Sequence, residues 1–269
     1  MTLREQMDQN GWIWEKAVFS KEEIAQIREW AIEGKKKNPK GDLFQDENLW
    51  KVLMDDRILK IVKQVIGENP VYFGDSNISF DVSDNGFHKD NVDRFNPEGG
   101  DWKGQYTIIR MGIYLQDHTQ HSGGITLREK SHKMSGVGHG KILNVRSAEG
   151  DVLSWFLTTT HSANAHVLKF APNWHLHPRL VRRFPKFLIQ PKIRPRIALF
   201  FSWAVNDDKL QRFTEYLKTR EYGVERWRNS VYPADRIEAA KQKGVTVIDF
   251  RAEAEQIDLN KASKEHIEQ

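Results

Sequence analysis

The 269-residue chain contains no cysteine, which excludes disulfide bonds and thiolate metal sites. Long apolar runs are also missing. The nearest one, residues 197–205, is about half as long as the roughly 18–20 residues of a membrane-spanning helix, and the first residues have no apolar signal-peptide core. We therefore expect a cytoplasmic protein without a membrane span. The composition, with 39% hydrophobic and 29% charged residues, is that of a globular chain long enough to bury a full core.

Acidic residues are absent between Val152 and Asn206, although the net charge of the whole chain is only +4. The same window contains eight lysines and arginines: Lys169, Arg179, Arg182, Arg183, Lys186, Lys192, Arg194 and Arg196. A local excess of cations attracts anions, so this stretch predicts contact with an anionic molecule. A solvated charged face is the alternative. Because aromatic residues interleave with the cations, a lid or a peripheral membrane contact also stays open.

Two helices are predicted near the N-terminus. Residues 18–34 carry apolar side chains at helical spacing, and Ser20 with Glu23 forms the pattern of a capping box at the start. Residues 46–66 also read as one helix, which ends at Gly67.

From residue 71 to 206, short β-rich segments alternate with connections rich in glycine, proline and asparagine. This pattern predicts a mainly β fold with flanking helices and a double-stranded β-helix core, the jelly-roll or cupin-like architecture. We expect one domain, 1–269, in three parts: helical support (1–70), the jelly roll (71–206) with a proline-rich insertion at 167–192, and a charged helical extension (207–269).

Two histidines and one aspartate form the most informative pattern. On an extended strand, residues i and i+2 point to the same face, so His88 and Asp90 can bind one ion. His161 follows the β-rich segment that begins at Gly150 and Asp151, and it would supply a second imidazole from a distant strand. Two histidines and one carboxylate leave three adjacent coordination positions open, which suits oxygen-activating Fe(II).

In their order along the chain, these segments resemble the phytanoyl-CoA dioxygenase-like branch of the Fe(II)/2-oxoglutarate oxygenases. The resemblance extends over about residues 10–206. Its motifs are the opening Gly11-Trp12-Ile13-Trp14, the segment His88-Lys89-Asp90, the turn Ser131-His132-Lys133 and the strand leading to His161. It implies that His88, Asp90 and His161 are the catalytic metal ligands, that the metal is Fe(II), and that 2-oxoglutarate and dioxygen are co-substrates.

The resemblance also implies an arginine for the distal carboxylate of 2-oxoglutarate, since a guanidinium fork grips a carboxylate with two hydrogen bonds. Arg196 opens a strand-like segment and is our choice. Arg194 is the alternative, because the interval after His161 is longer than in the family. Thr126 and Thr107 are further candidates for binding 2-oxoglutarate, although both are also ordinary strand-forming residues.

The resulting prediction is a hydroxylase. Related halogenases replace the carboxylate ligand with a small residue, whereas this chain retains Asp90. Desaturation, ring closure and epimerisation use the same triad and stay open. The cationic insertion suggests an anionic substrate, carboxylated or phosphorylated, either a small molecule or lipid-linked. Its leading contacts would be Arg179, Arg182 and Arg183.

Two other classes of function remain. The fold could serve as a non-catalytic jelly-roll module that binds an anionic ligand, although the complete triad disfavours this. A nucleic-acid-modifying oxygenase could use the basic stretch as a phosphate track. No separate nucleic-acid-binding module is recognisable in the sequence, so we expect no nucleic-acid partner. The sequence leaves the oligomeric state open.

Overall fold

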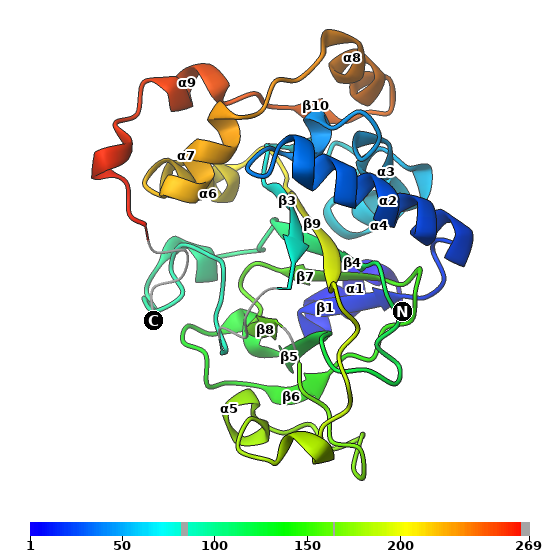
Figure 1. Cartoon of the computed structure of the whole chain (residues 1–269). Coiled ribbons are helices and arrows are strands. Elements are labelled where there is room, and N and C mark those ends of the chain that lie inside the picture. Colours follow the sequence, from blue (N-terminus) through cyan, green and yellow to red (C-terminus); the bar gives the residue numbers. More distant parts are fainter. Residues whose placement is uncertain (82–85, 164, 265–269) are drawn as a thin grey trace.

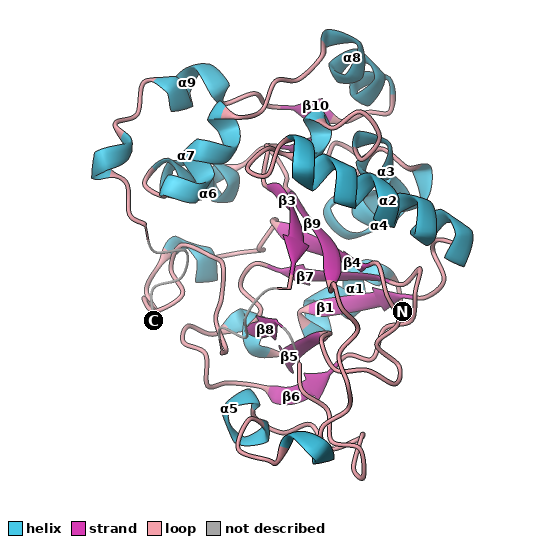
Figure 2. Cartoon of the chain, in the orientation of Figure 1, coloured by secondary structure: helices cyan, strands magenta, loops and turns pink. Residues whose placement is uncertain are grey.

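Two facing antiparallel sheets with flanking helices form the protein, as predicted (Figure 1 and Figure 2). The computed structural model describes residues 1–81, 86–163 and 165–264. The larger sheet has the order β1 (Trp12–Glu15), β7 (Val152–Phe156), β4 (Ile109–Tyr114), β9 (Ile197–Trp203) and β3 (Ser76–Phe80). The smaller sheet has the order β6 (Lys141–Asn144), β5 (Ile125–Glu129) and β8 (His161–Ala163). Short 3-10 turns lie at Leu43–Gln45, Gly100–Trp102, Ser131–Lys133, Lys186–Leu188 and Leu259–Lys261.

The alternation of side chains along β4 separates the core from the space between the sheets. Ile109, Met111 and Ile113 belong to the main hydrophobic core on the outer face of the larger sheet. Arg110 and Tyr114 project from the opposite face and line a cavity between the sheets. One face of β4 therefore packs in the hydrophobic core, and the other face lines the cavity.

Helices from the N-terminal region pack on the outer face of the larger sheet: α1 (Leu3–Asn10), α2 (Lys21–Lys37), α3 (Trp50–Leu53) and α4 (Asp56–Ile66). The capping box of Ser20 and Glu23 at the start of α2 is confirmed. The prediction of one helix over residues 46–66 was wrong. The Asp55 carboxylate accepts a hydrogen bond from the Arg57 amide and begins α4, so the chain bends between α3 and α4. The region also supplies β1, a strand that we did not predict.

The C-terminal region folds back onto the core. Its helices are α6 (Asp208–Lys218), α7 (Glu221–Arg228), α8 (Ala234–Gln242) and α9 (Arg251–Glu255), and its strand β10 (Thr246–Val247) pairs in parallel with β2 (Val71–Tyr72). Asp207 caps α6 and also accepts a hydrogen bond from the Thr107 hydroxyl at 2.6 Å. The start of α6 is thus fixed to the segment that precedes β4.

The insertion forms a small unit at the end of the molecule opposite α8 and β10 (Figure 1). It contains the short helix α5 (Pro178–Val181) and a satellite cluster of Leu168, Ala171 and Val181. The Gln190 amide donates to the Val167 carbonyl at 2.8 Å, which closes the unit at its base. Within the described ranges, no helix combines the length and apolarity that a membrane crossing requires.

Candidate metal centre and its cavity

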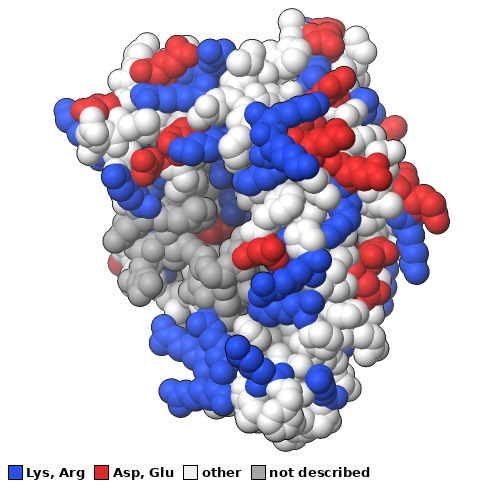
Figure 3. Space-filling model, viewed as in Figure 1, with Lys and Arg blue, Asp and Glu red and all other residues white. Residues whose placement is uncertain are grey.

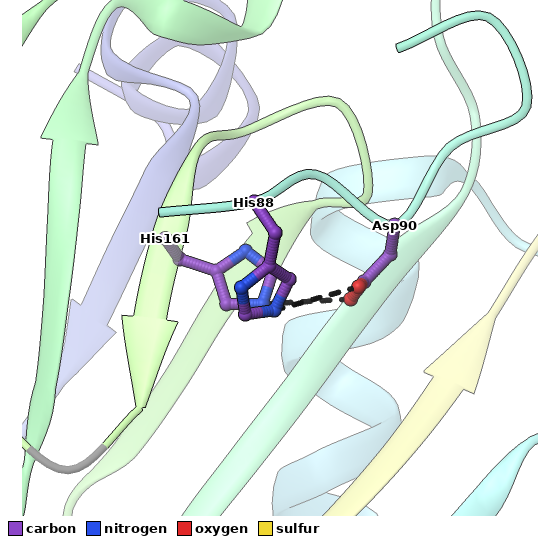
Figure 4. Close-up of side chains that lie close together, drawn as sticks. All are labelled: His88, Asp90 and His161. Atoms are coloured by element: carbon purple, nitrogen blue, oxygen red, sulfur yellow. Dashed lines mark ion pairs between the residues drawn. The ribbon is translucent and has the colours of Figure 1, made fainter. Parts of the chain in front are cut away.

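His88 and His161 lie directly opposite each other. Each backbone amide donates to the other residue's carbonyl at 2.9 Å, so the two residues form an antiparallel pair. Their side chains emerge on the same side, with ring centroids 4.3 Å apart. Asp90, two residues after His88, turns its carboxylate toward both rings (Figure 4). The structure therefore brings together the three metal ligands that the sequence predicts.

The distances suit a single metal ion. Nε2 of His88 lies 3.8 Å from Oδ1 of Asp90, and Nε2 of His161 lies 3.5 Å from Oδ2. All three ligand atoms are within 4.8 Å of one another. Metal–ligand bonds of about 2.1 Å place adjacent ligand atoms about 3 Å apart, so small side-chain rotations would complete the coordination.

Hydrogen bonds orient both imidazole rings. Nδ1 of His161 donates to the Thr159 carbonyl at 3.0 Å, and Nδ1 of His88 donates to the Gly86 carbonyl at 3.2 Å. A carbonyl oxygen only accepts, so each Nδ1 carries a proton, and in the neutral form of each ring Nε2 is the nitrogen available to a metal. Burial, together with the neighbouring His88, lowers the pKa of His161 to about 4, so this ring is neutral near pH 7.

Lys89, between the two ligands in sequence, points the other way. Its ammonium donates to the carbonyl of Ser131 at 2.7 Å and to that of Thr158. These contacts tie the motif to the turn after β5 and to the turn between β7 and β8. Burial lowers the pKa of Lys89 to about 7. The two hydrogen bonds from Lys89 anchor the backbone that carries His88 and Asp90.

Arg110 on β4 forms an ion pair with the Asp90 carboxylate. Its Nη1 donates to Oδ2 of Asp90 at 3.0 Å, its Nη2 to Oδ2 of Asp75 at 2.6 Å, and its Nε to the Ser202 hydroxyl at 3.2 Å. The three hydrogen bonds fix the orientation of the planar guanidinium, because each of its three nitrogens donates one of them. Asp90 is thus pinned through one oxygen, which favours single-oxygen binding to a metal.

Asp75 is a fully buried carboxylate shared by two arginines. Besides Arg110, Nη1 of Arg226 on α7 donates to its Oδ1 at 2.5 Å. Burial alone would raise the pKa of Asp75, but the two guanidinium groups and the Ser202 hydroxyl hold it below its ordinary value. A continuous chain of ion pairs therefore runs from α7 through Asp75 and Arg110 to Asp90, the carboxylate of the candidate triad.

A cavity of about 340 Å³ opens in front of the triad. Its walls combine polar and aromatic side chains. The sheets contribute Asn77, Ser79, Tyr114, Ile125, Trp155 and Phe200, and α6 and α7 contribute Phe213, Tyr216, Tyr222 and Arg226. The C-terminal extension thus forms one wall of the cavity.

Arg196 is almost completely buried, with 3% of its surface exposed, and it has no acidic partner among the described residues. Its Nε donates to the Gly123 carbonyl at 2.5 Å, and its guanidinium lies 5.1 Å from the centroid of the Tyr114 ring. Gly123 has a φ of +118°, and a Cβ there would come within 3.0 Å of His118. Both Nη atoms of Arg196 lack a hydrogen-bond partner within the described ranges. A buried cation with two unused donors suits an anionic ligand.

None of the four residues predicted to bind 2-oxoglutarate, Arg196 included, is among the residues that line the cavity. Arg194 is exposed and precedes β9. Thr126 lies on β5 next to Ile125, which lines the cavity, so strand alternation turns it away, and its hydroxyl donates to Asn144 at 2.8 Å. The Thr107 hydroxyl donates a hydrogen bond to Asp207, the residue that caps α6. Ser131-His132-Lys133 is a structural turn, as expected: His132 bonds the Asp8 carbonyl and takes no part in the triad.

The arginines predicted to contact substrate, Arg179, Arg182 and Arg183, are exposed at α5 and do not line the cavity. The insertion instead covers the smaller sheet, where the His175 ring accepts a hydrogen bond from the Asn144 amide at 3.1 Å. Its approach to the site is indirect: the His177 ring packs edge-on against Phe87, with centroids 5.1 Å apart.

Sequence analysis missed Arg110, Asp75 and the cavity wall from α6 and α7. The position of Arg110 within an otherwise apolar strand was the available signal, since a charge flanked by Ile109 and Met111 must find a buried partner. Its partners lie 20 and 35 residues away in the chain, so spacing did not reveal them.

No family model and no curated protein matches the sequence. Solved structures do resemble it. A non-heme monooxygenase, ThoJ in complex with nickel, is 13% identical, with a TM-score of 0.56 over 76% of this chain and 77% of that one. HygX from Streptomyces hygroscopicus, with nickel and 2-oxoglutarate bound, is 16% identical, with a TM-score of 0.55 over 76% and 87%. EctD from S. alaskensis, with 2-oxoglutarate and 5-hydroxyectoine, is 14% identical, with a TM-score of 0.53 over 75% and 74%.

The chain therefore has the fold of the non-heme, 2-oxoglutarate-dependent oxygenases. At these identities the likeness concerns the fold alone, and the chemistry has to be argued from the residues of the site.

Proposed function

We propose that the protein is an Fe(II)- and 2-oxoglutarate-dependent dioxygenase, most similar in motif order to the phytanoyl-CoA dioxygenase-like enzymes, and that it hydroxylates an anionic substrate. The observation that carries the proposal is the convergence of His88, Asp90 and His161 at a cavity. Arg196, a buried arginine with two unused donors, does not line this cavity but packs against Tyr114, which does. A triad alone would suit several divalent metals. The additional buried cation specifically suits a carboxylate co-substrate.

The donor set fits the proposed metal. Two imidazoles and one carboxylate form the ligand set of non-haem Fe(II) oxygenases, and with each Nδ1 bonded to a backbone carbonyl, Nε2 is the nitrogen that each ring presents to a metal. Arg196 would hold the distal carboxylate of 2-oxoglutarate. When bound, Fe(II) and 2-oxoglutarate would supply the activation of dioxygen and the oxidation of a substrate C–H bond, with succinate and carbon dioxide as by-products.

The chain's own residues contribute orientation and shielding. Arg110 fixes the Asp90 carboxylate, and the two backbone carbonyls fix the imidazole rings. The aromatic wall of Phe200, Phe213 and Tyr222 limits the access of water to the reacting carbon. Such a wall also favours a substrate with an apolar portion next to the metal.

An anionic substrate is supported by the charges around the cavity. Three arginines line it, Arg94, Arg110 and Arg226, against two carboxylates, Asp75 and Asp90, whereas the ammonium of Lys89 points away from the triad. Arg226 is well placed for a substrate contact, because it lies on the wall contributed by α7. The contacts predicted at Arg179, Arg182 and Arg183 stay a prediction, and they would require a substrate that extends beyond the cavity, such as a lipid-linked one.

Succinate formation tests the proposal. The purified protein should release succinate from 2-oxoglutarate only when Fe(II) and dioxygen are present, and an accepted substrate should increase the rate. His88→Ala should abolish both iron binding and succinate release, because it removes one of the three protein ligands and leaves nothing in its place. His139→Ala, a change at an exposed histidine, is the matched control and should leave both unaltered. Full iron stoichiometry in the His88 variant would contradict the assignment.

A further inference from the structure

Four large hydrophobic side chains project into solvent from the insertion. Their exposed fractions are 58% for Phe170, 56% for Trp174, 46% for Leu180 and 71% for Phe187. The described residues contain eight strongly exposed large hydrophobic side chains, so half of them lie within residues 170–187. A cluster of this kind usually marks a surface that meets a partner or a membrane.

Exposed cations alternate with these apolar side chains. Arg179, Arg182, Arg183 and Lys186 are all exposed, and no acidic residue occurs between Val152 and Asn206. Figure 3 shows lysine and arginine side chains gathered at the lower end of the molecule, around α5, with uncharged surface beside them. The unit has its own cluster of Leu168, Ala171 and Val181, so a folded element presents these groups.

We propose that the insertion is a docking surface for an anionic lipid membrane. Aromatic and aliphatic side chains at the tips of the unit would enter the boundary between headgroups and acyl chains, and the interspersed cations would bind the anionic headgroups. Phe and Trp suit this boundary because their rings are apolar yet tolerate a partly polar environment. The protein would lie on the surface, in accord with the lack of a crossing helix in the described ranges.

Other partners fit this surface less well. A second copy of the chain would bring the same cations face to face, and like charges repel. A single-stranded nucleic acid would use the cations and stack bases on the aromatic rings, but Leu180 has no ring to offer. The combination of cations with aliphatic and aromatic side chains is the one that a charged lipid interface accommodates as a whole.

The docking surface is connected to the segment of His88 through one indirect contact. His177 follows Trp174 in the same unit and packs on Phe87, the residue before the ligand His88. A membrane-bound orientation would therefore hold the metal-bearing segment close to the lipid surface. The inference does not depend on turnover, so it can be tested without a known substrate or metal.

Sedimentation with vesicles is the experiment. The full-length protein should sediment with vesicles that contain phosphatidylserine, bind vesicles of phosphatidylcholine alone much more weakly, and lose binding as salt rises. The variant Arg179→Gln/Lys186→Gln should weaken binding to the anionic vesicles roughly tenfold or more. Lys36→Gln/Lys37→Gln removes the same charge from α2 and should leave binding close to that of the unaltered protein.

The apolar contribution has its own variant. Trp174→Ser/Phe187→Ser should reduce binding to the anionic vesicles, whereas Val231→Ser, a change at another exposed apolar residue, should not. All three positions are strongly exposed, so melting temperatures should stay unchanged. Failure of the unaltered protein to bind anionic vesicles overturns the inference. So does vesicle binding that the charge and apolar variants leave intact, or binding to a single-stranded oligonucleotide without binding to vesicles.

Discussion

Arg110 has two opposing influences on a metal ion at the triad. Its positive charge, 3.0 Å from Oδ2 of Asp90, repels a cation, whereas its hydrogen bonds fix the carboxylate in position. The three directed bonds to Asp90, Asp75 and Ser202 indicate that positioning dominates, since an unneeded buried cation would be costly. Residues that orient metal ligands typically change metal affinity by a factor of 10–100.

Arg110→Gln should therefore weaken metal binding, by roughly tenfold. Titration with Co(II) measures this, because the visible absorption of Co(II) also reports the number and geometry of its ligands. Arg212→Gln is the matched control: Arg212 on α6 bonds Asp93 at 2.6 Å and Asp101 at 3.3 Å, in a half-buried pair of ion pairs without contact to the triad. Tighter Co(II) binding in the Arg110 variant would mean that charge repulsion outweighs positioning.

A single substitution can test the proposed role of Arg196 separately from that of Arg194. Arg196→Leu removes the guanidinium proposed to bind 2-oxoglutarate. Because a charge-assisted contact is worth about 1.5–3 kcal/mol, the KM for 2-oxoglutarate should rise at least roughly tenfold. The KM for substrate should change little, because the residue lies behind Tyr114. Arg194→Leu, at an exposed position two residues earlier, is the control. If the Arg194 variant raised the KM and the Arg196 variant did not, the exposed arginine would be the one that binds the co-substrate.

The sequence revealed the triad because its geometry is local. The i, i+2 spacing predicted a shared face for His88 and Asp90, and the motif order predicted His161 on a later strand. In the structure His88 forms only an isolated bridge with His161, yet the Asp90 carboxylate still lies near both rings. The pairing partner of His88 was not predictable in the same way. The ladder that sets the two histidines opposite each other depends on the sheet register, which a single sequence does not contain.

At the scale of elements, start signals proved more informative than apolar spacing. Ser20 and Glu23 marked the beginning of α2 correctly. The same reasoning applied to Asp55 would have split the region 46–66, because an aspartate before Asp56 and Arg57 is a favourable N-cap. Apolar periodicity alone predicted one continuous helix across the bend between α3 and α4, because residues of both helices contribute to the same core.

The strand β1 escaped prediction for a different reason. It has only four residues, and three of them, Trp12, Ile13 and Trp14, are apolar or aromatic without alternation. Its place at the edge of the sheet comes from pairing with β7, where Trp12 lies opposite Trp155. Gly11 allows the chain to turn from α1 into β1: its φ is +84°, and a Cβ there would come within 2.5 Å of the His132 ring.

At the scale of the whole molecule, the C-terminal helices join the fold to the site. The sequence predicted a charged helical extension, and its composition gave no indication that it forms a cavity wall. The aromatic residues of α6 and α7 that face the cavity follow the ordinary apolar spacing of a helix. Whether such a stripe meets the core or a ligand depends on the space opposite, and that space is set by the sheets.

Three buried histidines predict how the stability of the whole molecule depends on pH. Burial lowers the pKa of His118, His132 and His161 to about 4 in each case, against about 6.5 in an unfolded chain. Between these values the unfolded chain takes up protons that the folded protein does not. The free energy of unfolding therefore falls as the pH decreases from about 6.5 to 4, and it is fully retained above that range.

His132 allows a test of one contribution apart from the metal site. Its Nε2 bonds the Asp8 carbonyl at 3.1 Å, and its ring stacks on Phe156, so it joins α1 to the turn after β5. His132→Gln keeps a donor for that carbonyl but does not titrate. In metal-free protein, the free energy of unfolding in urea should fall by about 2 kcal/mol less between pH 7.5 and pH 5 in this variant than in the unaltered protein. An equal fall in both would show that His132 takes up its proton in the folded state, and that the Asp8 contact does not require a neutral ring.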